Sequence, residues 1–427
     1  MTFHLLQKSI CPTLLLVLFF ISTVGAVDDW PQWRGPNRND QSNETGLLKS
    51  WPEGGPTQLW VNKDAGLGYA GFAVVGDRLF TMGLEDDNEF ALCLNANTGE
   101  EVWRKDIGPR FKNGWGDGPR STPTVDGEYV YFMSAVGNVA CLTTADGTEK
   151  WTASMQDFGG KIPKWGYAES PLVDDGRVIC TPGGPNTTIV ALDKLTGKTV
   201  WKSEPIRGTM GDGKKTEPAI AHYSSVLPIE FNNRKQYVQL TVLAVVGLDA
   251  ETGKTLWQNP FPGRVAVIPS PIFDDGDVYV TAGYGVGSKL ISLEDDNQVD
   301  ETWYTKAMQN HHGSVIKVGD FFYGSSAKAF VCQSEKDGQM MWSDRSIKKG
   351  ALSYADGLFY HVQERGGEVL LFDATESGKV KVKGSFVLSP QTKRRNPRGM
   401  IWVHPVIANG KLYLRDQEFI HCYDIKE

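Results

Sequence analysis

The amino-acid sequence predicts an all-β protein, an eight-bladed β-propeller made of four-stranded antiparallel blades. Three observations predict it. A repeat runs through the chain, a tryptophan recurs at one place in that repeat, and the chain ends on a blade that lacks its last strand. Repeats of about 40 to 50 residues with four short strands each are typical of propellers.

The first residues, 1–26, have the pattern of a secretory signal peptide. A weakly basic start at Lys8 precedes an apolar run from Leu14 to Ile21, and the small residues Val24-Gly25-Ala26 follow. The alternative is an uncleaved membrane anchor, although the apolar run is short for a bilayer. We expect a periplasmic or secreted protein with no membrane span after cleavage, an N-terminal arm over 27–56 that wraps the surface, and a propeller over 57–427.

The repeat has two recognisable halves. The first half is seen in Ser170–Cys180 and returns in 122–131 and 270–280, each with an apolar run, Asp-Gly or Asp-Asp-Gly, and a second apolar run. The second half is seen in Ile189–Trp201 and returns in 97–103 and 251–257, each with Thr-Gly before the tryptophan. Asp-Gly and Thr-Gly supply the positive φ of tight turns, so each copy predicts four strands joined by hairpins.

The recurring tryptophan sets the number of blades. We expect it to dock between neighbouring sheets at positions 39 to 56 residues apart, with Phe386 in the eighth place: Trp60, Trp103, Trp151, Trp201, Trp257, Trp303 and Trp342. The residues after Phe386 supply only three strands, whereas Gln58–Val61 is a last strand without a blade. Pairing the two segments closes the ring and removes an open sheet edge.

The cysteines and the charge exclude several classes of protein. Cys93, Cys141, Cys332 and Cys422 fall at matching places in the repeat, so we expect buried small side chains rather than a disulfide framework. There is no Cys-x-x-Cys-His haem motif and no zinc-ligand spacing. The net charge of −7 argues against a nucleic-acid partner, because phosphate binding needs clustered Lys and Arg.

One stretch of the repeat resembles a known family. The pattern Ala191-x-Asp193-x-x-Thr196-Gly197-x-x-x-Trp201 resembles the tryptophan-docking repeat of the pyrroloquinoline-quinone (PQQ) propeller superfamily. That superfamily includes quinoprotein alcohol dehydrogenases and the propeller factor of outer-membrane protein assembly. Residues 30–36 also resemble the mature start of exported PQQ-like repeat proteins, so the resemblance covers essentially all of 30–427.

The resemblance covers both enzymes and non-enzymes, and the enzymes bind a cofactor. The dehydrogenases hold PQQ over the channel with Ca²⁺, a catalytic Asp and a vicinal Cys-Cys disulfide, and this sequence has no adjacent Cys pair. We therefore expect no cofactor and no metal, with PQQ and Ca²⁺ as the alternative.

Candidate ligand-binding residues lie outside the repeat consensus, mostly just before first strands, where they would converge on one mouth of the channel. They are Arg34, Trp115, Arg120, Trp165, Tyr167, Glu169, His222, Arg264, His311, His312, Arg398, Trp402 and His404. They would form a polar-aromatic pocket, or else plug the channel and brace its loops. Adjacent histidines on a strand point oppositely, so we expect His311 and His312 not to share a metal.

Three functions remain open. The favoured one is a monomeric binding or scaffold propeller that contacts a protein or glycan of the cell envelope, with Arg120 and Arg398 holding an anionic segment and contributing little to stability. The second is a PQQ-dependent dehydrogenase of alcohols or sugars, and the third is a hydrolase or lyase. The predicted fold alone does not distinguish these three functions, because one fold can carry many functions.

Overall fold

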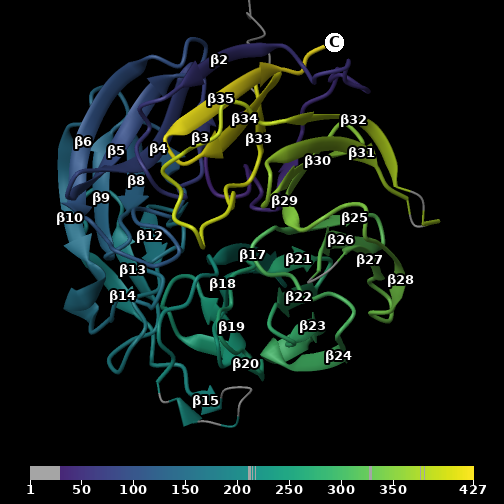
Figure 1. Cartoon of the computed structure of the whole chain (residues 1–427). Helices are drawn as coiled ribbons and strands as arrows, with labels where there is room; N and C mark the ends of the chain where they lie inside the picture. The colour runs from purple at the N-terminus through teal and green to yellow at the C-terminus, as the bar shows by residue number, and fades with distance from the viewer. Residues whose placement is uncertain are drawn as a thin grey trace, which may run out of the picture.

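The computed structural model describes residues 29–427 apart from 210–212, 214, 217, 327–328, 376 and 379, so the predicted signal peptide lies outside the described residues. Eight sheets surround a central axis in Figure 1, which confirms the eight-bladed propeller. Among the described residues, no helix has the length and apolar character needed to cross a membrane.

Each blade is an antiparallel sheet whose first strand lies nearest the axis and whose fourth strand lies at the rim (Figure 1). Blade 1 is β3 (Ala73–Val75), β4 (Arg78–Glu85), β5 (Asn88–Asn95) and β6 (Glu101–Pro109). Blade 2 is β7 (Thr124–Asp126), β8 (Tyr129–Met133), β9 (Asn138–Thr143) and β10 (Glu149–Ser154). Blade 3 is β11 (Leu172–Asp174), β12 (Arg177–Cys180), β13 (Val190–Asp193) and β14 (Thr199–Lys202). Blade 4 is β17 (Leu227–Phe231), β18 (Arg234–Leu240), β19 (Ala244–Asp249) and β20 (Thr255–Pro260).

The second half of the ring follows the same plan. Blade 5 is β21 (Ile272–Asp274), β22 (Asp277–Ala282), β23 (Gly287–Leu293) and β24 (Val299–Thr305). Blade 6 is β25 (Val315–Val318), β26 (Phe321–Ser325), β27 (Phe330–Ser334) and β28 (Met340–Asp344). Blade 7 is β29 (Gly350–Ala355), β30 (Leu358–Gln363), β31 (Glu368–Asp373) and β32 (Lys381–Val387). Outside the blades lie a hairpin of β15 (Gly208–Thr209) and β16 (Lys215–Thr216), and two 3-10 turns, η1 (Met155–Phe158) and η2 (Asp295–Asn297).

Blade 8 is shared by the two ends of the chain, as predicted. It combines β33 (Val406–Ala408), β34 (Lys411–Asp416) and β35 (Phe419–Asp424) with β2 (Gln58–Asn62). Strand β2 runs antiparallel to β35, with Trp60 opposite Cys422. The rim strand of the last blade therefore comes from the start of the propeller, and this pairing closes the ring.

The docking tryptophans join each blade to the next. The indole N–H of Trp201 in blade 3 donates to the carbonyl of Ala250 (3.1 Å), in the turn before the rim strand of blade 4. Gly253 in that turn has a left-handed backbone conformation (φ +70°), and a Cβ there would lie 2.3 Å from the Trp201 ring. Only glycine combines that backbone conformation with so close a ring, which explains the Thr-Gly of the repeat.

The same contact recurs around the ring, including the closing seam. Trp60 of β2 donates to the carbonyl of Ala96 in blade 1 (3.2 Å). The other tryptophans that donate to the next blade's turn are Trp103, Trp151, Trp303 and Trp342. Trp257 differs, because its N–H donates to Gln236 of its own blade (2.7 Å). All seven tryptophans therefore occupy the predicted place in a rim strand. Trp257 differs only in the acceptor of its indole N–H, which lies in its own blade.

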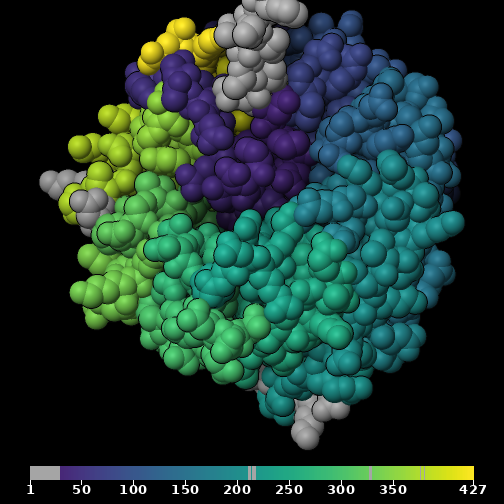
Figure 2. Space-filling model, turned by 180° about the vertical axis from the view of Figure 1, so that it is seen from behind, coloured from purple at the N-terminus to yellow at the C-terminus, as the bar shows by residue number. Residues whose placement is uncertain are grey.

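The N-terminal arm enters the channel, so the expectation that it wraps the surface is wrong. Trp30 is 2 % exposed and its backbone exchanges hydrogen bonds with Val74 of β3. Further along, β1 (Gln41–Ser42) adds a parallel strand to β29, the innermost strand of blade 7. Figure 2 shows the arm filling the middle of the ring on the face away from the viewer of Figure 1. The arm thereby closes one end of the channel.

The five described cysteines are buried and free, four of them at equivalent strand positions. This agrees with their expected role as small core side chains.

Candidate functional site

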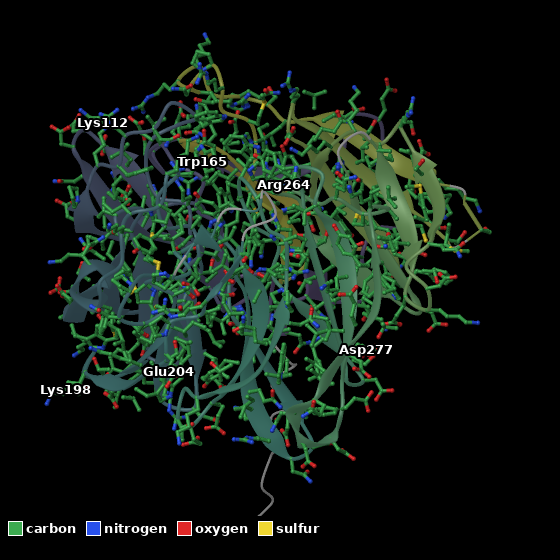
Figure 3. The ribbon with its side chains drawn as sticks, turned by 90° about the horizontal axis from the view of Figure 1, so that it is seen from below. Lys112, Trp165, Lys198, Glu204, Arg264 and Asp277 are labelled. Carbon is green, nitrogen blue, oxygen red and sulfur yellow. The ribbon has the colours of Figure 1, made fainter. Side chains whose placement is uncertain are left out.

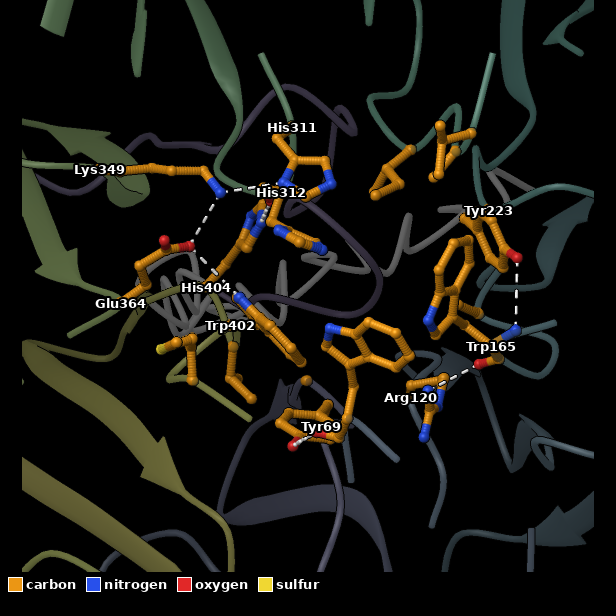
Figure 4. Close-up of a pocket in the computed structure, with 18 of the residues that line it drawn as sticks. Tyr69, Arg120, Trp165, Tyr223, His311, His312, Lys349, Glu364, Trp402 and His404 are labelled. Carbon is orange, nitrogen blue, oxygen red and sulfur yellow. Dashed lines mark hydrogen bonds and ion pairs between the residues drawn. The ribbon is translucent and has the colours of Figure 1, made fainter. Parts of the chain in front are cut away.

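The segments that precede the innermost strands converge on a cavity of about 460 Å³. In Figure 4, His311, Lys349 and Glu364 lie along one wall and Arg120, Trp165 and Tyr223 along the opposite one. The cavity volume lies in the range of small-molecule sites, and its lining is mostly aromatic and apolar with a few charged groups.

The floor of the cavity comes from the N-terminal arm. Trp33 lines the cavity, and its indole N–H donates to the hydroxyl of Ser270 (3.1 Å). The ring of His404 lies 4.5 Å from that of Trp33. Because the arm fills the channel behind these two rings, the site is a pocket closed at its inner end.

The entrance carries two cations that lie on aromatic rings. Lys164 Nζ is 4.6 Å from the ring centre of Trp165, and the guanidinium of Arg398 is 5.1 Å from that of Trp115. The two indoles meet edge to face at 5.8 Å. Both cationic side chains are exposed, and within the described residues neither has a carboxylate at ion-pair distance. A cation held over an indole is positioned without being neutralised.

Arg120 braces the loops instead of presenting its charge to a ligand. Its guanidinium donates to the carbonyls of Trp165 (2.7 Å), Gly116 (2.7 Å) and Gly118 (3.2 Å). Burial lowers the pKa of Arg120, with Tyr69 and Glu89 opposing the shift. The expectation that Arg120 can be replaced at little cost in stability therefore conflicts with the geometry, because its loss would leave three carbonyls without their donor.

The histidine wall consists of two neutral rings. Burial, followed by the charge of Lys349, lowers the pKa of His311 to about 3, and burial lowers the pKa of His312 well below its usual range. The two rings lie 3.7 Å apart, and His312 stacks on Trp402 at 4.8 Å. They belong to a loop rather than a strand, so the expectation that they point to opposite sides is wrong.

A chain of polar contacts runs behind this wall. Trp402 donates its indole N–H to Glu364 (3.3 Å), Glu364 pairs with Lys349 (3.1 Å), and Lys349 donates to Nδ1 of His311 (2.9 Å). Figure 4 draws this chain of contacts as dashed lines. The side chains come from the loop before blade 8, the β30–β31 turn, the start of blade 7 and the loop before blade 6.

Asp40, His404 and Ser314 are close together but do not form a nucleophilic triad. Nδ1 of His404 lies 2.8 Å from the hydroxyl of Ser314 and 3.3 Å from Asp40, while Nε2 donates to the carbonyl of His312 (2.7 Å). Although burial raises it, the pKa of Asp40 is lowered overall by Arg34 and His404. In a triad the serine and the acid bond to opposite nitrogens, whereas here both lie at Nδ1. The group anchors the arm and the backbone of His312.

A family model described as outer membrane protein assembly factor BamB, of the PQQ-repeat type, matches residues 87–344. This match covers more than half of the chain. The chain belongs to this PQQ-like, BamB-type propeller family. The match includes Trp115, Trp165 and His311, whereas Trp33, Lys349 and Arg398 of this BamB-type propeller lie outside it.

Solved structures show the same fold. BamB from Moraxella catarrhalis is 15% identical, with a TM-score of 0.58 over 87% of this chain and 98% of that one. Quinohemoprotein alcohol dehydrogenase from Comamonas testosteroni is 11% identical, with a TM-score of 0.63 over 93% of this chain and 81% of that one. At such identities the likeness concerns the fold alone.

A tetrathionate hydrolase of Acidithiobacillus ferrooxidans is 25% identical over 233 residues. That match covers 50% of this chain and 43% of the hydrolase, so this chain spans less than half of the length of that relative.

The cavity of this protein brings together many of the residues that were predicted to lie at the mouth of the channel. They are Trp115, Arg120, Trp165, His311, His312, Arg398, Trp402 and His404. Among the described residues, no group of three or more His, Cys, Asp or Glu side chains could hold a metal ion.

Other predicted residues lie outside the cavity. Tyr167 is buried and donates to the carbonyl of Pro182 (3.1 Å), and Glu169 accepts from the backbone N–H of Thr181 (2.6 Å). Burial raises the pKa of Glu169 to about 7 and lowers that of His222 to about 4. His222 is not among the lining residues, and its Nδ1 accepts from the N–H of Val267 (3.3 Å).

The remaining two arginines also lie outside the cavity. Arg34 is buried, pairs with Asp40 and donates to the carbonyl of Val315 (2.8 Å). Arg264 is exposed, and Figure 3 places it toward the same face as Trp165, with Asp277 toward the opposite face. Arg264 therefore lies toward the predicted face, but its side chain is not among the residues that line the cavity.

Sequence reasoning named the segment His222-Tyr223-Ser224, of which Tyr223 lines the cavity, but it missed several other lining residues: Trp33, Tyr69, Lys164, Tyr284, Lys349 and Glu364. Lys164 directly precedes the predicted Trp165, so extending that segment by one residue would have found it. Nothing in the local sequence marks Lys349 and Glu364, because their role depends on contacts between blades.

Glu89, a buried acid close enough to Arg120 to interact with its charge, predicts a dependence of stability on pH. Burial raises the pKa of Glu89 from 4.5 to about 7, although the N–H of Ala135 donates to its carboxylate (2.8 Å). A raised folded-state pKa gives a stabilising contribution that is complete below the ordinary pKa and is lost as the pH rises through about 7. Glu89→Gln does not ionise, so it should gain roughly 2 kcal/mol relative to the parent between about pH 5 and pH 8. Thermal unfolding of both proteins measures this, and a difference that does not change with pH would contradict it.

Proposed function

We propose that this chain is an exported binding protein whose closed pocket holds a small anionic ligand with a flat apolar body. The observation that carries the proposal is the pair of cations at the entrance, Lys164 and Arg398, each lying on an indole without a carboxylate partner in the described part of the chain. Export rests on the signal-like residues 1–26 and stays a prediction from the sequence.

The walls favour a flat ligand. Trp115 and Trp165 meet edge to face, Tyr69 lies 5.0 Å from Trp402, and Trp33 closes the floor. Rigid rings held by their neighbours offer large apolar contact areas with little loss of conformational entropy. A planar apolar body would pack between these rings.

The charges favour an anion. Among the described lining residues, Glu364 is the one carboxylate, and it is paired with Lys349 (3.1 Å). The two entrance cations are left without a counter-charge from the lining. In a cavity with low-dielectric walls, such an excess of positive charge attracts and orients a negative group.

The closed floor favours a small molecule over a broad macromolecular surface. A protein or glycan of the cell envelope, our expectation from the sequence, could still present a single anionic group to this mouth. The cavity of about 460 Å³ accommodates such a group or a whole ligand of drug size. We propose that this pocket binds the anionic group in either case, whether it belongs to a small ligand or to a larger partner.

The residues present do not fit the PQQ and Ca²⁺ pair that the fold family implies. Ca²⁺ takes six to eight oxygen ligands, several of them carboxylates. Glu364 already accepts from Lys349 and Trp402, and the described cysteines are buried in the strands of separate blades. We therefore propose no redox step for this site.

A second candidate is hydrolysis of a small anion. It is favoured by the neutral ring of His312, whose Nδ1 is buried without a partner among the described residues, and by the similarity to a tetrathionate hydrolase. Consumption of tetrathionate by the purified protein would support this candidate over simple binding.

The test of binding uses naphthalene-2-sulfonate as a flat anion and naphthalene-2-methanol as its neutral counterpart, followed by titration calorimetry. We expect the sulfonate to bind more tightly than the alcohol. Lys164→Met combined with Arg398→Met should weaken sulfonate binding at least about tenfold, a loss of about 1.4 kcal/mol, because both charges act on the same group. The alcohol should bind the variant and the parent alike.

Lys198→Met is the matched control, because Figure 3 shows Lys198 far from Trp165 and near the opposite face. Its affinity for the sulfonate and its melting temperature should equal those of the parent. Equal affinity for sulfonate and alcohol, or sulfonate binding that survives loss of both entrance cations, would contradict an anion site.

A further inference from the structure

The ring of His311 is held in a single protonation form by its neighbour. The ammonium of Lys349 can only donate, so Nδ1 of His311, at 2.9 Å, must accept. A protonated imidazole would place two donors face to face, and the low pKa of His311 agrees with a neutral ring. The proton of the neutral ring is therefore on Nε2.

We find no partner for that Nε2–H among the described residues. Nε2 of His311 is buried and makes no hydrogen bond within the described part of the protein. A buried donor left unpaired is costly, so an unpaired donor in the lining of a cavity indicates a place where a ligand atom completes the bond. His311 is a lining residue, on the wall opposite Trp165 and Tyr223 in Figure 4.

The ring is also held in place from both sides. His312 lies 3.7 Å from it, and Tyr284 meets it edge to face at 4.5 Å. Tyr284 adopts φ +59°, a left-handed conformation that is unfavourable for an aromatic residue. This backbone conformation belongs to the turn between β22 and β23, from which the Tyr284 ring contacts the imidazole.

Lys349 is itself oriented by the rest of the structure. Glu364 pairs with its ammonium at 3.1 Å, and the indole N–H of Trp402 donates to the same carboxylate at 3.3 Å. The order of contacts is Trp402, Glu364, Lys349 and His311, which fixes the direction in which each group donates.

We propose that the Nε2–H of His311 is a specificity-determining donor that binds an acceptor oxygen of the ligand's anionic group, and that Lys349 is the positioning residue that fixes its tautomer. This rests on the proposed function, since it assigns one contact within the same pocket. The contact suits an anionic group such as a carboxylate or a sulfonate, whose oxygens accept without having to donate in return.

The first test is the tautomer itself, which needs no ligand. ¹⁵N NMR of the histidine-labelled full-length protein should show a pyridine-type Nδ1 and a pyrrole-type Nε2 for His311, assigned by loss of these signals in His311→Gln. In Lys349→Met this preference should weaken, and Lys349→Arg, which keeps a donor, should retain it. A pyrrole-type Nδ1 in the parent would overturn the proposal.

The second test is the affinity for naphthalene-2-sulfonate. His311→Gln places an amide N–H near the position of Nε2 and should bind within about threefold of the parent, whereas His311→Asn cannot reach that position and should bind at least about tenfold more weakly. His222→Asn is the control, because His222 is not among the residues that line the cavity.

The outcomes separate the two proposals. If His311→Asn binds as the parent does while Lys164→Met with Arg398→Met still loses binding, the anion pocket stands and the role of His311 is wrong. If the parent does not distinguish the sulfonate from its alcohol, the proposed function fails and this contact fails with it.

Discussion

Deletion of residues 29–62 should open the propeller and cause aggregation, whereas deletion of 29–46 should leave the ring closed. The longer deletion removes β2, whose pairing with β35 supplies the rim strand of blade 8. It also removes Trp60, which docks on blade 1. An unpaired apolar edge at both ends of the seam favours association between chains. The shorter deletion keeps both contacts.

Size-exclusion chromatography and thermal unfolding measure the difference. The shorter deletion should stay monomeric with a lowered melting temperature, because the buried Trp30 and the pairing of β1 with β29 are lost. If the longer deletion is equally monomeric and melts at the same temperature as the shorter one, the closing role of β2 is wrong.

Trp30→Ala and Trp201→Ala should each destabilise the protein by about 3–5 kcal/mol. Trp201 is 8 % exposed at a blade interface, and Trp30 is 2 % exposed between blades 8 and 1, packed with Phe72 and Val406. Burial, and not membership of the repeat, sets the cost of removing such a side chain. Denaturant unfolding measures both.

Leu195→Ala is the control, since that side chain is 55 % exposed in the turn next to β13. It should change the free energy of unfolding by no more than about 0.5 kcal/mol. A Trp30→Ala protein as stable as the Leu195→Ala protein would mean that the arm only lies on the surface.

The fold could be predicted because the repeat encodes it locally. The Thr-Gly pair before Trp201 specifies the turn on which the tryptophan of the preceding blade docks, and Asp175-Gly176 specifies a hairpin. Gly197, Asp175 and Gly176 all have positive φ in the structure. The closing strand was predictable for the same reason, since Gln58–Val61 has the pattern of a rim strand without the rest of a blade.

The path of the arm could not be predicted, because the arm lies outside the repeat. Trp30 and Trp33 carry no periodicity that shows which blade they contact. In the structure Trp33 reaches Ser270, a distance of 237 residues along the chain. Only the closed ring brings these residues together.

The sequence predicted where the candidate site lies, but not which of its charged side chains are available to a ligand. Trp115, Trp165 and His311 precede innermost strands, so the propeller plan alone places them at one mouth. Whether a cation is available to a ligand depends on its neighbours. The guanidinium of Arg120 donates to three carbonyls, whereas that of Arg398 lies on an indole with no ion pair in the described part of the chain. Those neighbours come from other blades, and one sequence does not show them.

The most direct test of the anion pocket is the position of a bound anion in a crystal. Crystals soaked with 6-bromonaphthalene-2-sulfonate should show an anomalous bromine peak between the rings of Trp33, Trp115, Trp165 and Trp402, with the sulfonate within reach of Lys164 or Arg398 or of Nε2 of His311. Bromine peaks confined to the outer surface of the blades, with the pocket occupied by solvent alone, would contradict the account.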